Sequence, residues 1–156
     1  MKLSEHFDST EFEKADDPIP KEAMPAFEYL CKEILEKARN HFDKPFITTS
    51  GYRSSAHNAA VGGVPTSQHV ATADHCAVDF QVKDTDPADV FDWMRSQPLP
   101  FDQLILEYGA VKDSTGDDCI HVSWRKNPRR QAKIGATHNR SRYVSVEVAP
   151  LNPSVG

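Results

Sequence analysis

The clearest pattern of hydrophobic and polar positions in the chain lies between residues 24 and 42. Apolar side chains recur there every three or four residues, which predicts an amphipathic helix of about five turns. A second helix is expected to begin after Asp86, because an aspartate followed by a proline is typical of a helix N-cap and first turn. This second helix should end before Pro98, since proline cannot continue a helix.

Short segments rich in β-branched and aromatic residues predict strands. Within 77–82, Val78, Phe80 and Val82 share one face, and Asp79 points to the other. Strands and helices follow one another without a regular βαβ alternation, so the expected fold class is α+β, with a small, mostly antiparallel sheet flanked by helices. The strands are expected at 45–49, 77–82, 103–108 and 119–124.

The remaining segments predict loops and a tail. The opening, from residue 3 to 17, is polar and ends in a loop signature, and residues 58–68 contain Gly62-Gly63 and Pro65, which indicate a loop. Beyond Gly135 the chain is expected to be extended or disordered. One domain is therefore predicted over residues 1–136, followed by a C-terminal tail over 137–156, in agreement with the usual size of a single domain.

Composition and charge narrow the function classes. With 38% hydrophobic and 26% charged residues the chain is globular, and its net charge of -5 argues against a dedicated nucleic-acid binder. No apolar run approaches the ~20 residues of a membrane span, and the N-terminus lacks a secretory signal. Three cysteines without an export signal suggest reduced thiols and synthesis in the cytoplasm. Residues 124–142 carry seven Lys and Arg and no acid, so this stretch is either an ordinary solvated surface or a basic face for an anionic polymer such as a cell wall.

Three residues stand out as candidate metal ligands: His69, Asp79 and His121. Two imidazoles and one carboxylate leave a tetrahedral zinc ion with one open position, which is the arrangement of a hydrolytic site. A lone histidine or aspartate in a strand is more often structural or exposed. A closed Cys₂His₂ structural zinc site, built from Cys76, Cys119, His75 and His121, is a second alternative, although its spacing matches no common finger pattern. A cysteine nucleophile at Cys119 lacks a residue to orient its base.

An ordered set of motifs changes this picture. The motifs are Ser50-Gly51-Tyr52-Arg53-Ser54, Asn58-Ala59-Ala60-Val61-Gly62-Gly63, Ser67-Gln68-His69, Ala77-Val78-Asp79, Phe101-Asp102-Gln103-Leu104-Ile105 and Ile120-His121-Val122-Ser123. Together these motifs resemble the zinc D-alanyl-D-alanine carboxypeptidase family, which includes VanX- and VanY-type enzymes and the L-alanyl-D-glutamate endolysins of phages, and the phage or prophage branch is the most similar. The resemblance extends from about Leu3 to Arg130 and implies a hedgehog/DD-peptidase-like fold.

The resemblance assigns roles residue by residue. His69, Asp79 and His121 match the family's ligands for a single Zn²⁺ ion. Arg53 matches the arginine that pairs with a substrate carboxylate, a task that suits its planar, two-point guanidinium. The general base is expected at Asp118, three residues before the last histidine, with Asp117 as the fallback. Further substrate-binding or outer contacts are expected from Ser67 and Gln68, and outer partners of a histidine ligand from Gln103 and Glu107.

One departure concerns the spacing of the first two ligands. Residues 70–78 separate His69 from Asp79, a longer spacing than the family usually has. Asp74 or His75 could replace Asp79 as a ligand, or the extra residues could bulge out as a longer loop. The bulge is favoured because Ala77-Val78-Asp79-Phe80 keeps the strand pattern that follows.

The expected activity is hydrolysis of the stem peptide of bacterial peptidoglycan by a zinc peptidase. The motifs leave open whether the bond is D-Ala-D-Ala or L-Ala-D-Glu, and whether cleavage is terminal or internal. A binding module that grips cell-wall peptide without cutting it is the alternative, and the carboxylate of Asp118 favours catalysis. A phage-type enzyme made in the cytoplasm would reach the wall through a separate lysis system.

Overall fold

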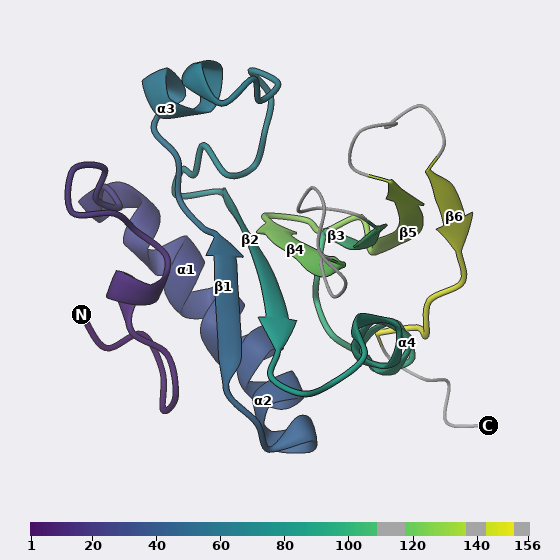
Figure 1. Ribbon diagram of the computed structural model, residues 1–156. Helices are drawn as coiled ribbons and strands as arrows, with labels where there is room; N and C mark the ends of the chain where they lie inside the picture. Colours follow the sequence, from purple (N-terminus) through teal and green to yellow (C-terminus); the bar gives the residue numbers. More distant parts are fainter. Residues whose placement is uncertain (109–117, 137–142, 152–156) are drawn as a thin grey trace.

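The structure is a computed structural model, and it describes residues 1–108, 118–136 and 143–151. Its centre is a six-stranded sheet in the order β1-β2-β4-β3-β5-β6 (Figure 1). All neighbouring strands are antiparallel except β3 and β5, which are parallel. The predicted α+β class with a mostly antiparallel sheet is therefore confirmed. The strands are β1 (Phe46–Ser50), β2 (His75–Val82), β3 (Gln103–Tyr108), β4 (Cys119–Arg125), β5 (Gln131–Ala136) and β6 (Val144–Val146).

The long helix predicted over residues 24–42 is present. It consists of α1 (Met24–Leu30), a π-helical segment (Cys31–Leu35) and α2 (Glu36–Phe42), which follow one another without a break. Its apolar stripe is buried except at the two ends, where Met24 and Phe42 are partly exposed, and it packs against β2 and β4. Figure 1 shows the helix lying across one side of β1 and β2. The helix ends at Asp43, whose left-handed conformation (φ 51°) is typical of a residue that terminates a helix.

The second predicted helix is α4 (Pro87–Arg95). The side chain of Asp86 accepts a hydrogen bond from the backbone N–H of Ala88 at 2.9 Å, and Pro87 occupies the first turn, as the sequence predicts. Val90, Phe91 and Met94 are buried in the same core cluster as the long helix. Both helices therefore cover the apolar face of the sheet.

Two segments differ from the sequence-based expectations. A short helix, α3 (Ser55–Ala60), occupies the start of the segment expected to be a loop, because the Ser54 side chain accepts from the N–H of His57 and caps it. The N-terminal segment also contains two short 3-10 helices (Ser9–Glu11 and Lys21–Ala23). The polar opening is anchored by Leu3, Phe7 and Phe12, which are buried in the core.

The described part of the predicted tail joins the sheet. β6 pairs with β5 in antiparallel register, and the N–H of Ala149 donates to the carbonyl oxygen of Arg95 at 2.8 Å. Neither β5 nor β6 was expected from the sequence, because β5 lies in the basic stretch and pairs with the distant strand β3, and β6 only extends the sheet beyond β5. Residues 143–151 thus pack on the domain that was predicted to end at residue 136.

Strand alternation gives the sheet two chemically different faces. Val78 on β2 and Val122 on β4 are paired and point into the helix-covered core. The next pair along the strands is Asp79 and His121, which by alternation lies on the opposite face. Within the described residues, no helix is both long and apolar enough to cross a membrane.

Candidate metal centre

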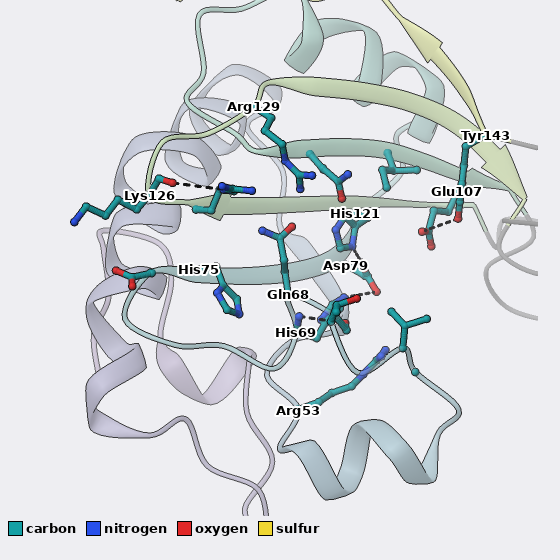
Figure 2. Close-up of a pocket in the computed structure, with 18 of the residues that line it drawn as sticks. Arg53, Gln68, His69, His75, Asp79, Glu107, His121, Lys126, Arg129 and Tyr143 are labelled. Carbon is teal, nitrogen blue, oxygen red and sulfur yellow. Dashed lines mark hydrogen bonds and ion pairs between the residues drawn. The ribbon is translucent and has the colours of Figure 1, made fainter. Parts of the chain in front are cut away.

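Three segments bring His69, Asp79 and His121 together on the face of the sheet opposite the long helix and α4 (Figure 2). Asp79 on β2 and His121 on β4 are direct partners in the antiparallel ladder. His69 lies in the loop before β2. One candidate ligand atom from each residue falls within 4.8 Å of the others, so the three side chains could hold one metal ion.

The orientation of His69 is fixed by a backbone contact. Its Nδ1 lies 2.7 Å from the carbonyl oxygen of Gly51. A carbonyl oxygen can only accept, so Nδ1 carries the proton and the lone pair of the neutral ring is on Nε2. That Nε2 atom is 3.3 Å from Oδ2 of Asp79. The ring therefore presents its free nitrogen to the other two candidate ligands, in the way that outer contacts commonly orient metal-binding histidines.

Gly51 holds its carbonyl in place because the backbone passes very close to the N-terminal segment. A Cβ atom on Gly51 would collide with the backbone of Phe12. The adjoining N–H of Tyr52 donates to the carbonyl oxygen of Phe12 at 2.7 Å. The glycine of the Ser50-Gly51-Tyr52-Arg53 motif thus allows a close approach that positions the carbonyl under His69.

Asp79 provides the negative charge of the site. Its Oδ1 lies 2.8 Å from Nδ1 of His121, and its side chain is only 14% exposed. Burial raises the pKa of this carboxyl group, but the neighbouring imidazoles of His69 and His121 outweigh burial and hold the pKa far below its usual range. The Asp79 contact in turn raises the pKa of His121, although burial of the ring opposes it. The aspartate is therefore ionised whenever the protein is folded at neutral pH.

The donor set fits a zinc ion. Two nitrogen atoms and one carboxylate oxygen match the chemistry that zinc prefers and leave one position of a tetrahedron open. Two ligand atoms on a tetrahedral ion at ~2.0–2.1 Å lie roughly 3.3 Å apart. The separation of Nε2 of His69 from Oδ2 of Asp79 equals this value, at 3.3 Å. His69, Asp79 and His121 would hold the metal, with His69 already oriented by Gly51.

The triad lines a cavity of about 800 Å³ that also contains the residues expected to bind substrate. Arg53 lines this cavity, and its guanidinium donates to Oγ of Ser50 at 2.9 Å. Its backbone N–H donates to the carbonyl oxygen of His69 at 2.9 Å, which places Arg53 beside the metal ligands. The cavity is large enough for several residues of a peptide, and Arg53 offers a cation within it.

Ser67 and Gln68 also line the cavity, and both have internal partners. Oγ of Ser67 accepts from the N–H of His69 at 3.3 Å, and Nε2 of Gln68 donates to Oδ2 of Asp102 at 3.0 Å. Asp102 is fully buried and takes two further hydrogen bonds from the guanidinium of Arg129 at 3.0 and 2.8 Å. These contacts hold the loop that carries His69.

A comparison with models of known protein families shows which family the chain belongs to. The model described as peptidase M15 matches residues 5–114, about 70% of the chain. The chain belongs to the peptidase M15 family. A comparison with curated proteins finds no match. The matched segment of this M15 metallopeptidase includes His69 and Asp79 and ends before His121. The pairing of strands in the sheet brings His121 beside these two residues.

The base predicted for the M15 peptidase, Asp118, directly precedes β4. Its backbone carbonyl accepts from Nε2 of Gln81 at 2.9 Å, and Asp118 is not among the residues that line the cavity. Glu107 does line the cavity, and its Oε1 accepts from the hydroxyl of Tyr143 at 3.2 Å. The fallback base, Asp117, lies outside the described residues.

Strand alternation could have drawn attention to Glu107 earlier. Gln103, Ile105 and Glu107 share the cavity face of β3, while Leu104 and Leu106 point into the core. The sequence interpretation gave Glu107 and Gln103 only an outer role beside a histidine. The structure places both along the cavity, with Ile105 paired directly to His121.

Neither of the alternative ligands in the longer loop belongs to the candidate metal cluster. The two ring nitrogens of His75 lie 3.1 Å from the hydroxyl of Thr72 and 2.9 Å from the carbonyl oxygen of Val70, so His75 belongs to the loop's own hydrogen bonds. Asp74 lines the cavity but does not belong to the candidate metal cluster. Residues 70–75 therefore form a hairpin beside the site in this M15 peptidase, and β2 continues from His75 to Asp79.

The cysteines also lie outside the candidate metal cluster. Cys76 points into the core, and burial raises the pKa of both the Cys76 and the Cys119 thiols. A buried thiol with a raised pKa is a poor nucleophile and a poor metal ligand. In the described part of the chain, the candidate cluster consists of His69, Asp79 and His121 alone.

Proposed function

We propose that this M15 family member is a peptidase that uses one zinc ion to hydrolyse the stem peptide of bacterial peptidoglycan. The observation that carries the proposal is the convergence of His69, Asp79 and His121 in a cavity large enough for a peptide. Membership of the family supports the metallopeptidase class. The peptidoglycan substrate and the phage-type origin rest on the resemblance of the motifs.

The protein's own residues have separable roles in this proposal. Zinc supplies a Lewis acid that polarises a carbonyl group and makes a water molecule more acidic. Arg53 would bind a substrate carboxylate beside the ligands, since a guanidinium matches a carboxylate at two points. The loop of Ser67 and Gln68, tied to Asp102, keeps the first histidine ligand in position.

The general base is the one role with two candidates. The motif favours Asp118, which directly precedes the strand of His121. The lining of the cavity favours Glu107, whose carboxylate shares the cavity with the triad. Either would accept a proton from the attacking water and pass it to the leaving amine. Substitution of each residue in turn distinguishes them, as described below.

The first experiment is the zinc content per chain of untagged protein purified without added metal. We expect about one zinc per chain, followed by cleavage of purified muropeptides detected by mass spectrometry. Absence of zinc, with none taken up on titration, would contradict the proposal. Zinc with tight peptide binding but no cleavage would favour the alternative of a non-catalytic cell-wall binding module.

A further inference from the structure

One end of the cavity is basic. Arg125, Lys126 and Arg129 line it together and are called here the basic end. They come from the stretch whose positive charge is evident in the sequence, but the structure separates its members. Arg130 turns inward instead and donates to the carbonyl oxygens of Leu99 and Gln97 at 2.9 and 3.1 Å. Only part of the basic stretch therefore faces the cavity.

The basic end lies at a defined distance from the metal ligands. His121 pairs with Asp79, and Arg125, four residues further along β4, pairs with His75. Four residues of a strand span about 13 Å. Figure 2 shows Lys126 and Arg129 on one side of His121 and Glu107 on the other. Arg53, in contrast, is bound through its backbone to His69 and belongs to the metal end.

The charges at the basic end are only partly balanced. Asp102 has no exposed surface, and its hydrogen bonds go to Arg129 and Gln68. Nε of Arg125 is 4.0 Å from Asp102, and the Arg125 side chain is 43% exposed. Among the described residues that line this end, the other acid is Asp74, whose backbone carbonyl oxygen accepts from the N–H of Lys126 at 2.8 Å. Three cations thus face two carboxylates, one of which solvent cannot reach.

We propose that the basic end is a subsite for a second carboxylate of the substrate, bound by Arg125 and Lys126, with the backbone of Arg125 about 13 Å along β4 from that of His121. The proposal rests on the peptidase function proposed above and specifies its substrate class. The preferred peptide would carry an internal or side-chain carboxylate at roughly this reach from the scissile bond. Arg129 is held by Asp102 and would shape the subsite.

Stem pentapeptides that differ in a single carboxylate test the subsite. One peptide keeps both internal carboxylates, a second has the α-carboxylate of D-glutamate amidated, and a third has the side-chain carboxylate of diaminopimelate amidated. The proteins are the wild type, the double variant Arg125→Gln/Lys126→Gln, and the charge-matched control Lys21→Gln/Lys37→Gln, whose lysines are exposed and outside the cavity. Binding is measured by calorimetry and cleavage by mass spectrometry.

We expect one amidation to weaken binding and raise KM about five- to tenfold in the wild type and the control, in keeping with the modest strength of partly exposed charge pairs. The double variant should lose this discrimination, and added salt should reduce it in the wild type. Equal binding and cleavage of all three peptides by the wild type would overturn the subsite. A double variant that still distinguished the peptides would overturn it as well.

The same data separate the two proposals. If the wild type cleaves the peptides without distinguishing them, the peptidase function stands and the subsite is wrong. If it binds the doubly acidic peptide more tightly through Arg125 and Lys126 but cleaves none, the subsite stands and the peptidase function is wrong. Binding of an anionic wall polymer by the basic residues, with no preference among the peptides, would also overturn the carboxylate subsite.

Discussion

Nδ1 of His69 donates a hydrogen bond to the carbonyl oxygen of Gly51 at 2.7 Å, and this contact connects the metal ligands to the N-terminal segment. Gly51 can offer its carbonyl only because it has no side chain, since its Cα lies against the backbone of Phe12. Phe12 is itself buried in the core. The position of a candidate ligand thus depends on packing that begins near residue 12, far from it in sequence.

The first prediction follows from this contact. Gly51→Ala should lower the free energy of unfolding by about 1–3 kcal/mol, the usual cost of overpacking, and weaken zinc affinity because His69 loses its fixed orientation. Denaturant unfolding and zinc titration measure the two effects. The matched control is Gly62→Ala, where φ is +74° but the added methyl group meets no atom within 4 Å. It should lose some stability and keep zinc affinity, and equal zinc affinity in both variants would contradict the role of Gly51.

The second prediction concerns the ligand set. His121→Ala should abolish zinc binding and activity, whereas His75→Ala should retain about one zinc per chain, because both nitrogens of His75 have partners within its own hairpin. Elemental analysis of the two purified variants decides the matter. Zinc retained by His121→Ala and lost from His75→Ala would place the ligand in the longer loop instead.

The third prediction distinguishes the two candidate bases. Glu107→Gln and Asp118→Asn should both retain zinc, because neither residue belongs to the metal cluster. We expect the larger loss of kcat, at least about a hundredfold, in Glu107→Gln, since its carboxylate lines the cavity. The opposite ranking would assign the base to Asp118, as the motif predicts. Full activity in both variants would show that neither carboxylate is the general base.

The fourth prediction is a pH dependence of stability. Burial raises the pKa of Asp102, but the hydrogen bonds and charge of Arg129 outweigh it and lower the pKa. A lowered pKa in the folded state stabilises the protein above the unfolded value of about 3.9, and this contribution is lost as pH falls through the folded value. Asp102→Asn should therefore be less stable at pH 7 and show a flatter decline below about pH 4. Parallel unfolding curves of the two proteins from pH 7 to 3 would contradict this account.

Local patterns predicted much of the fold. The stripe over 24–42, the Asp86-Pro87 cap and the alternation around Asp79 depend on residues close in sequence, and the helices and the strand they predict are present. β5 was not predicted, because it pairs with the distant strand β3, and β6 was not predicted, because it only extends the sheet beyond β5. Leu3, Phe7 and Phe12 were not recognised as core residues, because isolated apolar residues in a polar segment show no periodicity.

The candidate site was also predicted only in part from the sequence. Motif order was enough to name His69, Asp79 and His121, and the structure brings them together. The partners that orient them, such as the carbonyl of Gly51, are backbone groups that side-chain motifs do not report. Alternation along β3 places Glu107 on the same face as Ile105, and the register between β3 and β4, which aligns Ile105 with His121, shows that this face lies beside the metal ligands.

The hairpin between Val70 and His75 closes on itself, with Thr72 and His75 paired through both backbone and side chain. The length of this hairpin therefore does not affect the positions of the metal ligands, because strand β2 begins at the end of the hairpin and is already paired with β4 before Asp79. A protein engineer could lengthen this turn, or graft a recognition peptide or a fluorescent label into it, while leaving the metal-binding geometry intact. Sequence searches that demand a fixed interval between the first two ligands would, for the same reason, overlook proteins built in this way.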